Sequence, residues 1–128
     1  MKQYLLGTFA LTFSLLAACT NSSDDNPGFT REAVVGTDGK PDGQALFVQN
    51  CAACHQKDRD MVGPALKGVL ERWGGDKTRL YAFIRDNQAM IAKGDARAVA
   101  VKKQWGGTMP AFPQLTDAQI EAILNHVQ

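Results

Sequence analysis

The chain has 128 residues, of which 45% are hydrophobic and 21% are charged, so it is long enough for one small domain of ordinary globular composition. Its formal net charge is +1. This balance lacks the basic excess of a nucleic-acid-binding protein, and we therefore expect no nucleic-acid partner.

The first 18 residues have the features of a secretory signal peptide. Lys2 provides a positive charge, and residues 4–18 form an apolar run of about 15 residues, which is shorter than the ~20 residues needed to span a membrane. The run ends in Leu-Ala-Ala-Cys at Cys19, which resembles the lipobox of bacterial lipoproteins. We expect cleavage before Cys19 and acylation of its thiol. Ordinary signal cleavage with an incidental cysteine is the alternative.

Residues 19–41 are expected to be a lipidated cysteine followed by a flexible tether. The segment is rich in Asn, Ser, Asp, Gly and Pro and contains little that could form a core. A flexible chain of about 20 residues has a mean reach of about 25 Å. The short apolar run at residues 33–35 could also pack on the domain, and the sequence leaves this open.

A helix is predicted from Gly43 to about residue 53, with Asp42 as its N-cap. At its end lies Cys51-Ala-Ala-Cys54-His55, the C-x-x-C-H signature of covalent c-type haem attachment. The spacing places both thiols on one side of a helical turn, where they can add to the two haem vinyl groups, and the adjacent imidazole can ligate the iron. A buried porphyrin would also enlarge the core of a domain of about 90 residues.

A Gly-Pro-Ala-Leu segment follows at residues 63–66, eight residues after His55. With this segment the chain resembles the class I cytochrome c family. The resemblance implies that the Pro64 carbonyl accepts a hydrogen bond from the second imidazole nitrogen of His55, which orients the ring. The alternative is a simple turn, since Gly-Pro is a common turn dipeptide.

Two further helices are predicted before the next motif. One begins at Asp76 or Thr78 and ends near residue 88, and its apolar face is expected to pack on the haem edge. Gly94 and Asp95 end one segment and cap the next, which is expected to run over residues 96–104.

Thr-Met-Pro-Ala-Phe-Pro at residues 108–113 resembles the family loop that carries the second iron ligand. The resemblance implies that Met109 provides a thioether sulfur to the face opposite His55, in a loop stiffened by its prolines. A core methionine is the alternative role. Met90 is a competing ligand, and an open sixth position is a third possibility, whereas Met61 lies too near His55 in the chain to reach the opposite face.

The last helix is expected to begin at Thr116 with a capping box formed with Gln119. In the family this helix crosses the first one, and Gly43 and Phe47 match the small and aromatic residues at that contact. The chain departs from the family pattern in having His126 where the last helix usually has an aromatic residue.

The resemblance covers residues 42–128 and implies an all-α small cytochrome c fold, in which crossing N- and C-terminal helices and further short helices surround one covalent haem c. It implies a one-electron carrier and not an enzyme, because His55 and Met109 would fill the iron and leave no position for a small-molecule substrate. The expected partners are redox proteins, met on the periplasmic side of a bacterial membrane to which Cys19 anchors the chain.

Other functions remain open at this point. If the methionine ligand is absent or labile, the protein could be a haem-based gas sensor or a weak peroxidase. A zinc module would need four ligands, and beside Cys51 and Cys54 the chain has only two histidines, of which His55 directly adjoins Cys54. A thiol oxidoreductase would need a βαβ pattern, which the sequence does not show. The chain could also be a tethered subunit of a larger redox complex.

Overall fold

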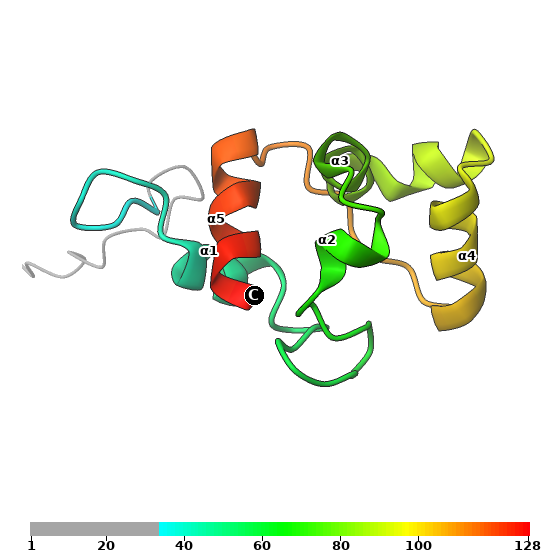
Figure 1. Ribbon diagram of the computed structural model, residues 1–128, viewed down its shortest axis with the longest axis horizontal. Helices are drawn as coiled ribbons and strands as arrows, with labels where there is room; N and C mark the ends of the chain where they lie inside the picture. Colours follow the sequence, from blue (N-terminus) through cyan, green and yellow to red (C-terminus); the bar gives the residue numbers. More distant parts are fainter. Residues whose placement is uncertain (1–33) are drawn as a thin grey trace, which may run out of the picture.

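The computed structural model describes residues 34–128, so the predicted signal peptide, Cys19 and most of the predicted tether lie outside the described residues. The described part contains five helices and confirms the predicted all-α fold (Figure 1). The helices are α1 (Gly43–Asn50), α2 (Val69–Arg72), α3 (Lys77–Ala92), α4 (Ala96–Trp105) and α5 (Asp117–Val127).

The crossing of α1 and α5 is the main helix–helix contact of the fold (Figure 1). A Cβ atom added at Gly43 would overlap the Ala122 carbonyl and would lie 3.3 Å from the Cβ of His126, so the two helices meet here without a side chain between them. The rings of Phe47 and His126 lie beside this point, with centroids 5.6 Å apart and planes at 45°. His126 therefore occupies the place of the missing aromatic residue.

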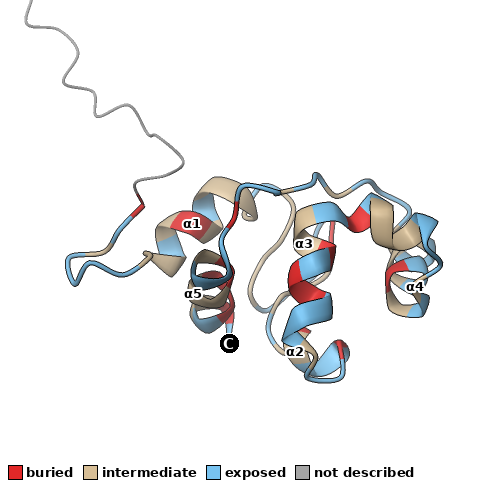
Figure 2. Cartoon of the chain, turned by 90° about the horizontal axis from the view of Figure 1, so that it is seen from above, coloured by how far each residue is buried: buried red, intermediate tan, exposed pale blue. Residues whose placement is uncertain are grey.

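The apolar face predicted for the last helix is confirmed. Ile120 and Val127 are fully shielded from solvent, and Leu46 of α1 is equally buried opposite them. The buried residues of α5 and α3 face the interior while the outer faces of these helices are exposed (Figure 2). Burial of such side chains contributes about 1.5–3 kcal/mol each to folding.

Most helices begin and end at the residues that local capping signals predict. The Asp42 carboxylate accepts from the backbone N–H of Ala45 at 3.0 Å, and the capping box of Thr116 and Gln119 is present. Asp95 caps α4 after Gly94, whose φ of 76° ends the preceding helix. The four-residue α2 was not predicted from the sequence.

Helix α1 ends at Asn50, about three residues earlier than predicted, and Cys51 leaves the helical conformation with φ −121°. The chain then turns through the C-x-x-C-H motif, where the N–H of His55 donates to the Cys51 carbonyl at 2.9 Å. The thiols are thus presented by a hydrogen-bonded turn after the helix.

Helix α3 begins after Asp76, one of the two predicted starts, but it extends to Ala92 and contains a break that was not predicted. Asp86 has φ −154° and ψ 77°, which are not helical values, and its carboxylate accepts from the N–H of Ala89 at 2.9 Å. Asp86 therefore acts as the N-cap of a second helical segment that runs in a new direction.

Val34, the first residue that the structure describes, packs on the domain, whereas most of residues 35–40 are exposed. Val34 is buried in the core, its carbonyl accepts from the N–H of Asp42 at 3.2 Å, and Val35 forms an isolated antiparallel bridge with Pro41. Of the apolar run at residues 33–35, Val34 thus packs on the domain, which the sequence had left open. None of the helices in the described region is long and apolar enough to cross a membrane.

We expect Gly43→Ala to destabilise the protein despite the better helix propensity of alanine, because the added methyl group would push α1 away from the Ala122 carbonyl. The expected loss is about 1–3 kcal/mol in the free energy of unfolding, measured by denaturant titration. Gly107→Ala is the matched control, since its methyl group would meet only the Trp105 carbonyl at 3.9 Å. Equal stability of the two variants would contradict the close helix crossing.

Candidate functional site

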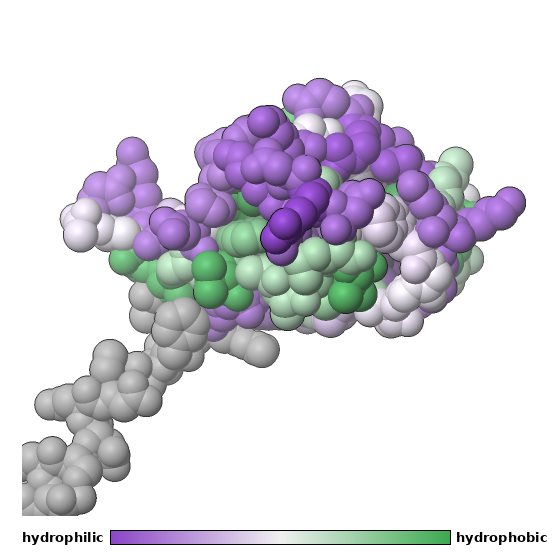
Figure 3. All heavy atoms as spheres, turned by 90° about the horizontal axis from the view of Figure 1, so that it is seen from below, coloured by the Kyte–Doolittle hydropathy of each residue, from purple (hydrophilic) through white to green (hydrophobic). Residues whose placement is uncertain are grey.

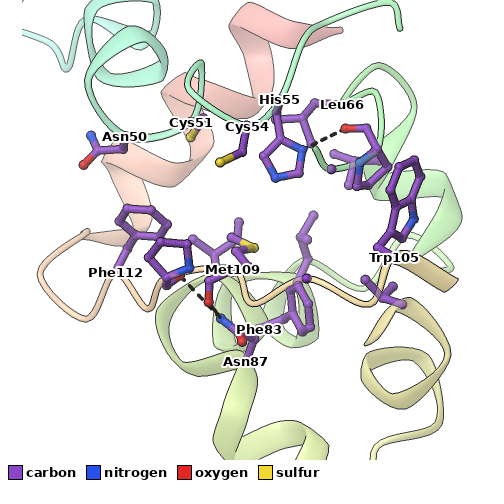
Figure 4. Close-up of a pocket in the computed structure, with 18 of the residues that line it drawn as sticks. Asn50, Cys51, Cys54, His55, Leu66, Phe83, Asn87, Trp105, Met109 and Phe112 are labelled. Atoms are coloured by element: carbon purple, nitrogen blue, oxygen red, sulfur yellow. Dashed lines mark hydrogen bonds between the residues drawn. The ribbon is translucent and has the colours of Figure 1, made fainter. Parts of the chain in front are cut away.

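A cavity of about 350 Å³ lies between the crossed helices and the rest of the fold. Side chains from the turn after α1, from α2, α3 and α4, from the loop before α5 and from α5 itself form its walls. Most of these side chains are apolar, as in sites that bind large hydrophobic cofactors. Figure 4 shows that only a few polar side chains point into this apolar space.

One wall carries the three functional side chains of the C-x-x-C-H motif. The thiols of Cys51 and Cys54 and the imidazole of His55 point into the cavity from the same segment (Figure 4). Neither thiol is in a disulfide. Burial raises the pKa of the Cys51 thiol to about 11, so this thiol is protonated at neutral pH.

The imidazole of His55 is held in one orientation from behind. Its Nδ1 lies 2.8 Å from the Pro64 carbonyl oxygen. Because a carbonyl can only accept, Nδ1 carries the proton, and Nε2 is left as a basic nitrogen for the cavity side. The chain runs so close to the ring that a Cβ atom at Gly63 would overlap it, so glycine is required beside His55.

The opposite wall carries Met109, which lies in the loop between α4 and α5 and faces the side of the cavity where His55 stands (Figure 4). Met90 is not among the residues that line the cavity, and it packs against the apolar core instead. Met61 is 42% exposed and lies outside the cavity lining. Of the three methionines in the described region, Met109 is therefore the one with access to the space in front of His55.

Asn87, Arg97 and Trp105 are among the cavity residues that were not predicted from the sequence. Asn87 is 1% exposed and donates from Nδ2 to the Met109 carbonyl at 3.0 Å. Trp105 lies at the far end of the cavity from Cys51 (Figure 4). None of the three belongs to a motif, and only their place in the fold reveals them.

Arg97 allows a test of whether these residues suit haem. Its Nε is buried without a hydrogen-bond partner in the described structure, and Arg97 and Trp105 line both the main cavity and a smaller adjoining one. A buried unpaired guanidinium nitrogen is costly unless an anion meets it. Haem is a flat apolar ring with two carboxylates on one edge, so an apolar slot with thiols at one end and a cation near the other fits it.

Comparison with known proteins agrees with this geometry. The family model described as cytochrome c matches residues 41–128. The chain belongs to the cytochrome c family. Over 99 residues it is 29% identical to cytochrome c6 of Cyanidium caldarium, covering 77% of this chain and 78% of that protein.

Two further relatives extend the comparison. A 97-residue match, 29% identical, joins the chain to the cbb3-type cytochrome c oxidase subunit CcoP of Rhodobacter capsulatus and covers 66% of this chain but 27% of that subunit. The solved structure of cytochrome c from Rhodothermus marinus superposes with a TM-score of 0.54 at 27% identity, covering 67% of this chain and 73% of that one.

The protein is a monohaem cytochrome c that carries electrons and is not an enzyme. Its cofactor is a covalent haem c, for which Cys51 and Cys54 have the attachment spacing. Its partners are redox proteins, as is typical of cytochromes c, which are extracytoplasmic.

We expect Arg97→Gln to lower the midpoint potential of the haem, because removing a nearby cation stabilises the more positive ferric state. Removing one charge near a redox centre at an intermediate effective dielectric changes the energy by about 1 kcal/mol, or a few tens of mV. Redox titration checks this. Arg79→Gln is the control, since Arg79 pairs with Asp95 on the surface at 2.8 Å and does not line the cavity. Equal potentials in the two variants would place Arg97 away from the haem.

Proposed function

We propose that this cytochrome is a lipid-anchored carrier of single electrons whose iron is ligated by His55 Nε2 and Met109 Sδ. The observation that carries the proposal is that these two side chains enter the apolar cavity from opposite walls (Figure 4). Bound haem c supplies an iron that alternates between the ferric and ferrous states. A thioether ligand favours the ferrous state and raises the potential.

The surrounding residues hold both ligands through the change in charge. The hydrogen bond from His55 to the Pro64 carbonyl fixes the imidazole plane and increases the donor strength of Nε2. Pro110 and Pro113 restrict the backbone on the C-terminal side of Met109. With His55 and Met109 as its two protein ligands, the iron would have no position left for a substrate, so the group would exchange electrons with little rearrangement of the protein around it.

Redox partners are proposed to approach where the cavity reaches the surface. Val62 lines the cavity and is 64% exposed, and Met61 next to it is 42% exposed. Figure 3 shows a band of hydrophobic surface next to a hydrophilic area on one face of the molecule. Since the formal net charge is only +1, short-range apolar contact is a better basis for docking here than long-range electrostatic steering.

The anchor is proposed to be an acylated Cys19 on the periplasmic side of a bacterial membrane. The lipobox-like sequence before Cys19 supports this. From Cys19 to Val34, the first residue that the structure describes, a flexible chain of about 15 residues would have a mean reach of roughly 20 Å. Such a tether would keep the cytochrome close to membrane-bound partners and still allow it to turn between a donor and an acceptor.

The first experiment compares the far-red absorption of the oxidised holoprotein with that of Met109→Ala. We expect a weak sulfur-to-iron charge-transfer band in the wild type and its complete loss in Met109→Ala, with uptake of carbon monoxide on reduction. Met90→Ala is the matched control and should keep the band, because Met90 does not line the cavity. A band that survives Met109→Ala, or a wild type that lacks the band and binds carbon monoxide readily, would overturn the ligand assignment.

We expect Cys19→Ser, once its signal peptide is removed, to pass from the membrane fraction into the soluble periplasmic fraction, because serine has no thiol to form the thioether to diacylglycerol. Fractionation followed by haem staining measures this, with the mass of the protein showing whether the signal peptide is removed. Ser22→Ala, three residues further along the chain, is the control that should stay with the membranes. A Cys19→Ser chain that has lost its signal peptide and still stays with the membranes as the control does would exclude the lipid anchor.

A further inference from the structure

Asn87 is the one buried polar side chain among residues 34–128, with 1% of its surface exposed. Its Nδ2 donates to the Met109 carbonyl at 3.0 Å and lies 3.4 Å from the Pro110 carbonyl (Figure 4). Its Oδ1 accepts from Nε2 of Gln88 at 2.7 Å. The amide thus joins α3 directly to the backbone of the residue proposed as the sulfur ligand.

The break in α3 creates this arrangement. Because Asp86 is not helical, the carbonyl of Ile84 is released from the helical ladder, and it accepts from the N–H of Phe112 at 3.2 Å. The segment from Met109 to Phe112 is therefore bonded to α3 at both of its ends. An unbroken helix would use the Ile84 carbonyl internally.

The segment needs such external bonds, because it has little regular structure of its own. It lies outside the helices, and Pro110 has no N–H to donate. Where the thioether can reach depends on where the Met109 backbone is held. A weak ligand such as a thioether is displaced readily when its backbone is free to move.

We propose that Asn87 is a positioning residue that holds the peptide of Met109, so that the thioether stays directed across the cavity at His55. This inference rests on the proposed role of Met109 as iron ligand. It gives the α3 break a function: the break turns the amide of Asn87 and the carbonyl of Ile84 toward the same loop.

The test is the binding of added imidazole to the ferric holoprotein, which competes with the methionine sulfur for the iron. In Asn87→Ala, imidazole should bind about 5- to 30-fold more tightly than in the wild type, as expected for the loss of one buried hydrogen bond. The far-red sulfur band should weaken in parallel. Asn87→Leu, which keeps the branched shape of the side chain and removes the donor, should show the same change.

Two controls separate positioning from general destabilisation. Asn125 is exposed on α5 and does not line the cavity, so Asn125→Ala should leave imidazole affinity unchanged. Val127→Ala creates a void in the fully buried core away from the cavity. It should lower the unfolding temperature without changing imidazole affinity.

The outcomes distinguish this inference from the proposed function. If the far-red band is lost in Met109→Ala but both Asn87 variants bind imidazole as Asn125→Ala does, Asn87 has no positioning role and the electron-carrier proposal stands. If the band survives in Met109→Ala, the ligand assignment itself fails. If neither Asn87 variant incorporates haem whereas Val127→Ala does, Asn87 is required for folding and the positioning role is overturned.

Discussion

The hydrogen bond from the His55 imidazole to the Pro64 carbonyl joins the two chain segments that form one wall of the cavity. Both thiols and the imidazole come from one turn, so their relative positions depend on local geometry, and the carbonyl fixes the remaining freedom of the ring. Gly63 must pass against that ring without a side chain. The other helices and loops complete the cavity around this wall.

The opposite wall is built differently. Met109 lies in a loop, and its position depends on bonds to α3, more than 20 residues away in the chain. The His55 wall is therefore set by neighbours in sequence, and the Met109 wall by tertiary contacts. This difference suits the two iron ligands. The imidazole is held close to the haem by the neighbouring attached cysteines, whereas the position of the thioether depends on its loop.

The cavity also bears on stability. If nothing fills a cavity of about 350 Å³, the apolar side chains that line it lack packing partners on one side. Covalent attachment of haem c thus supplies the centre of the core as well as the redox group. The domain binds its cofactor on residues from nearly every element, and cofactor and fold stabilise each other.

The sequence by itself determined the features that depend on residues a few positions apart. These are the C-x-x-C-H turn, the caps at Asp42, Asp95 and Thr116, the apolar face of α5 and, through the family resemblance, the fold. Only the tertiary structure decided the short α2, the break at Asp86, the burial of Asn87 and of the Arg97 Nε atom, and the packing of Val34. It also placed Met109, and not Met90, on the cavity. The reason is physical. Capping and helical periodicity depend on residues a few positions apart, so a local sequence pattern predicts them. The other features depend on contacts between segments that are distant in the chain, and a local pattern gives no information about the energy of those contacts.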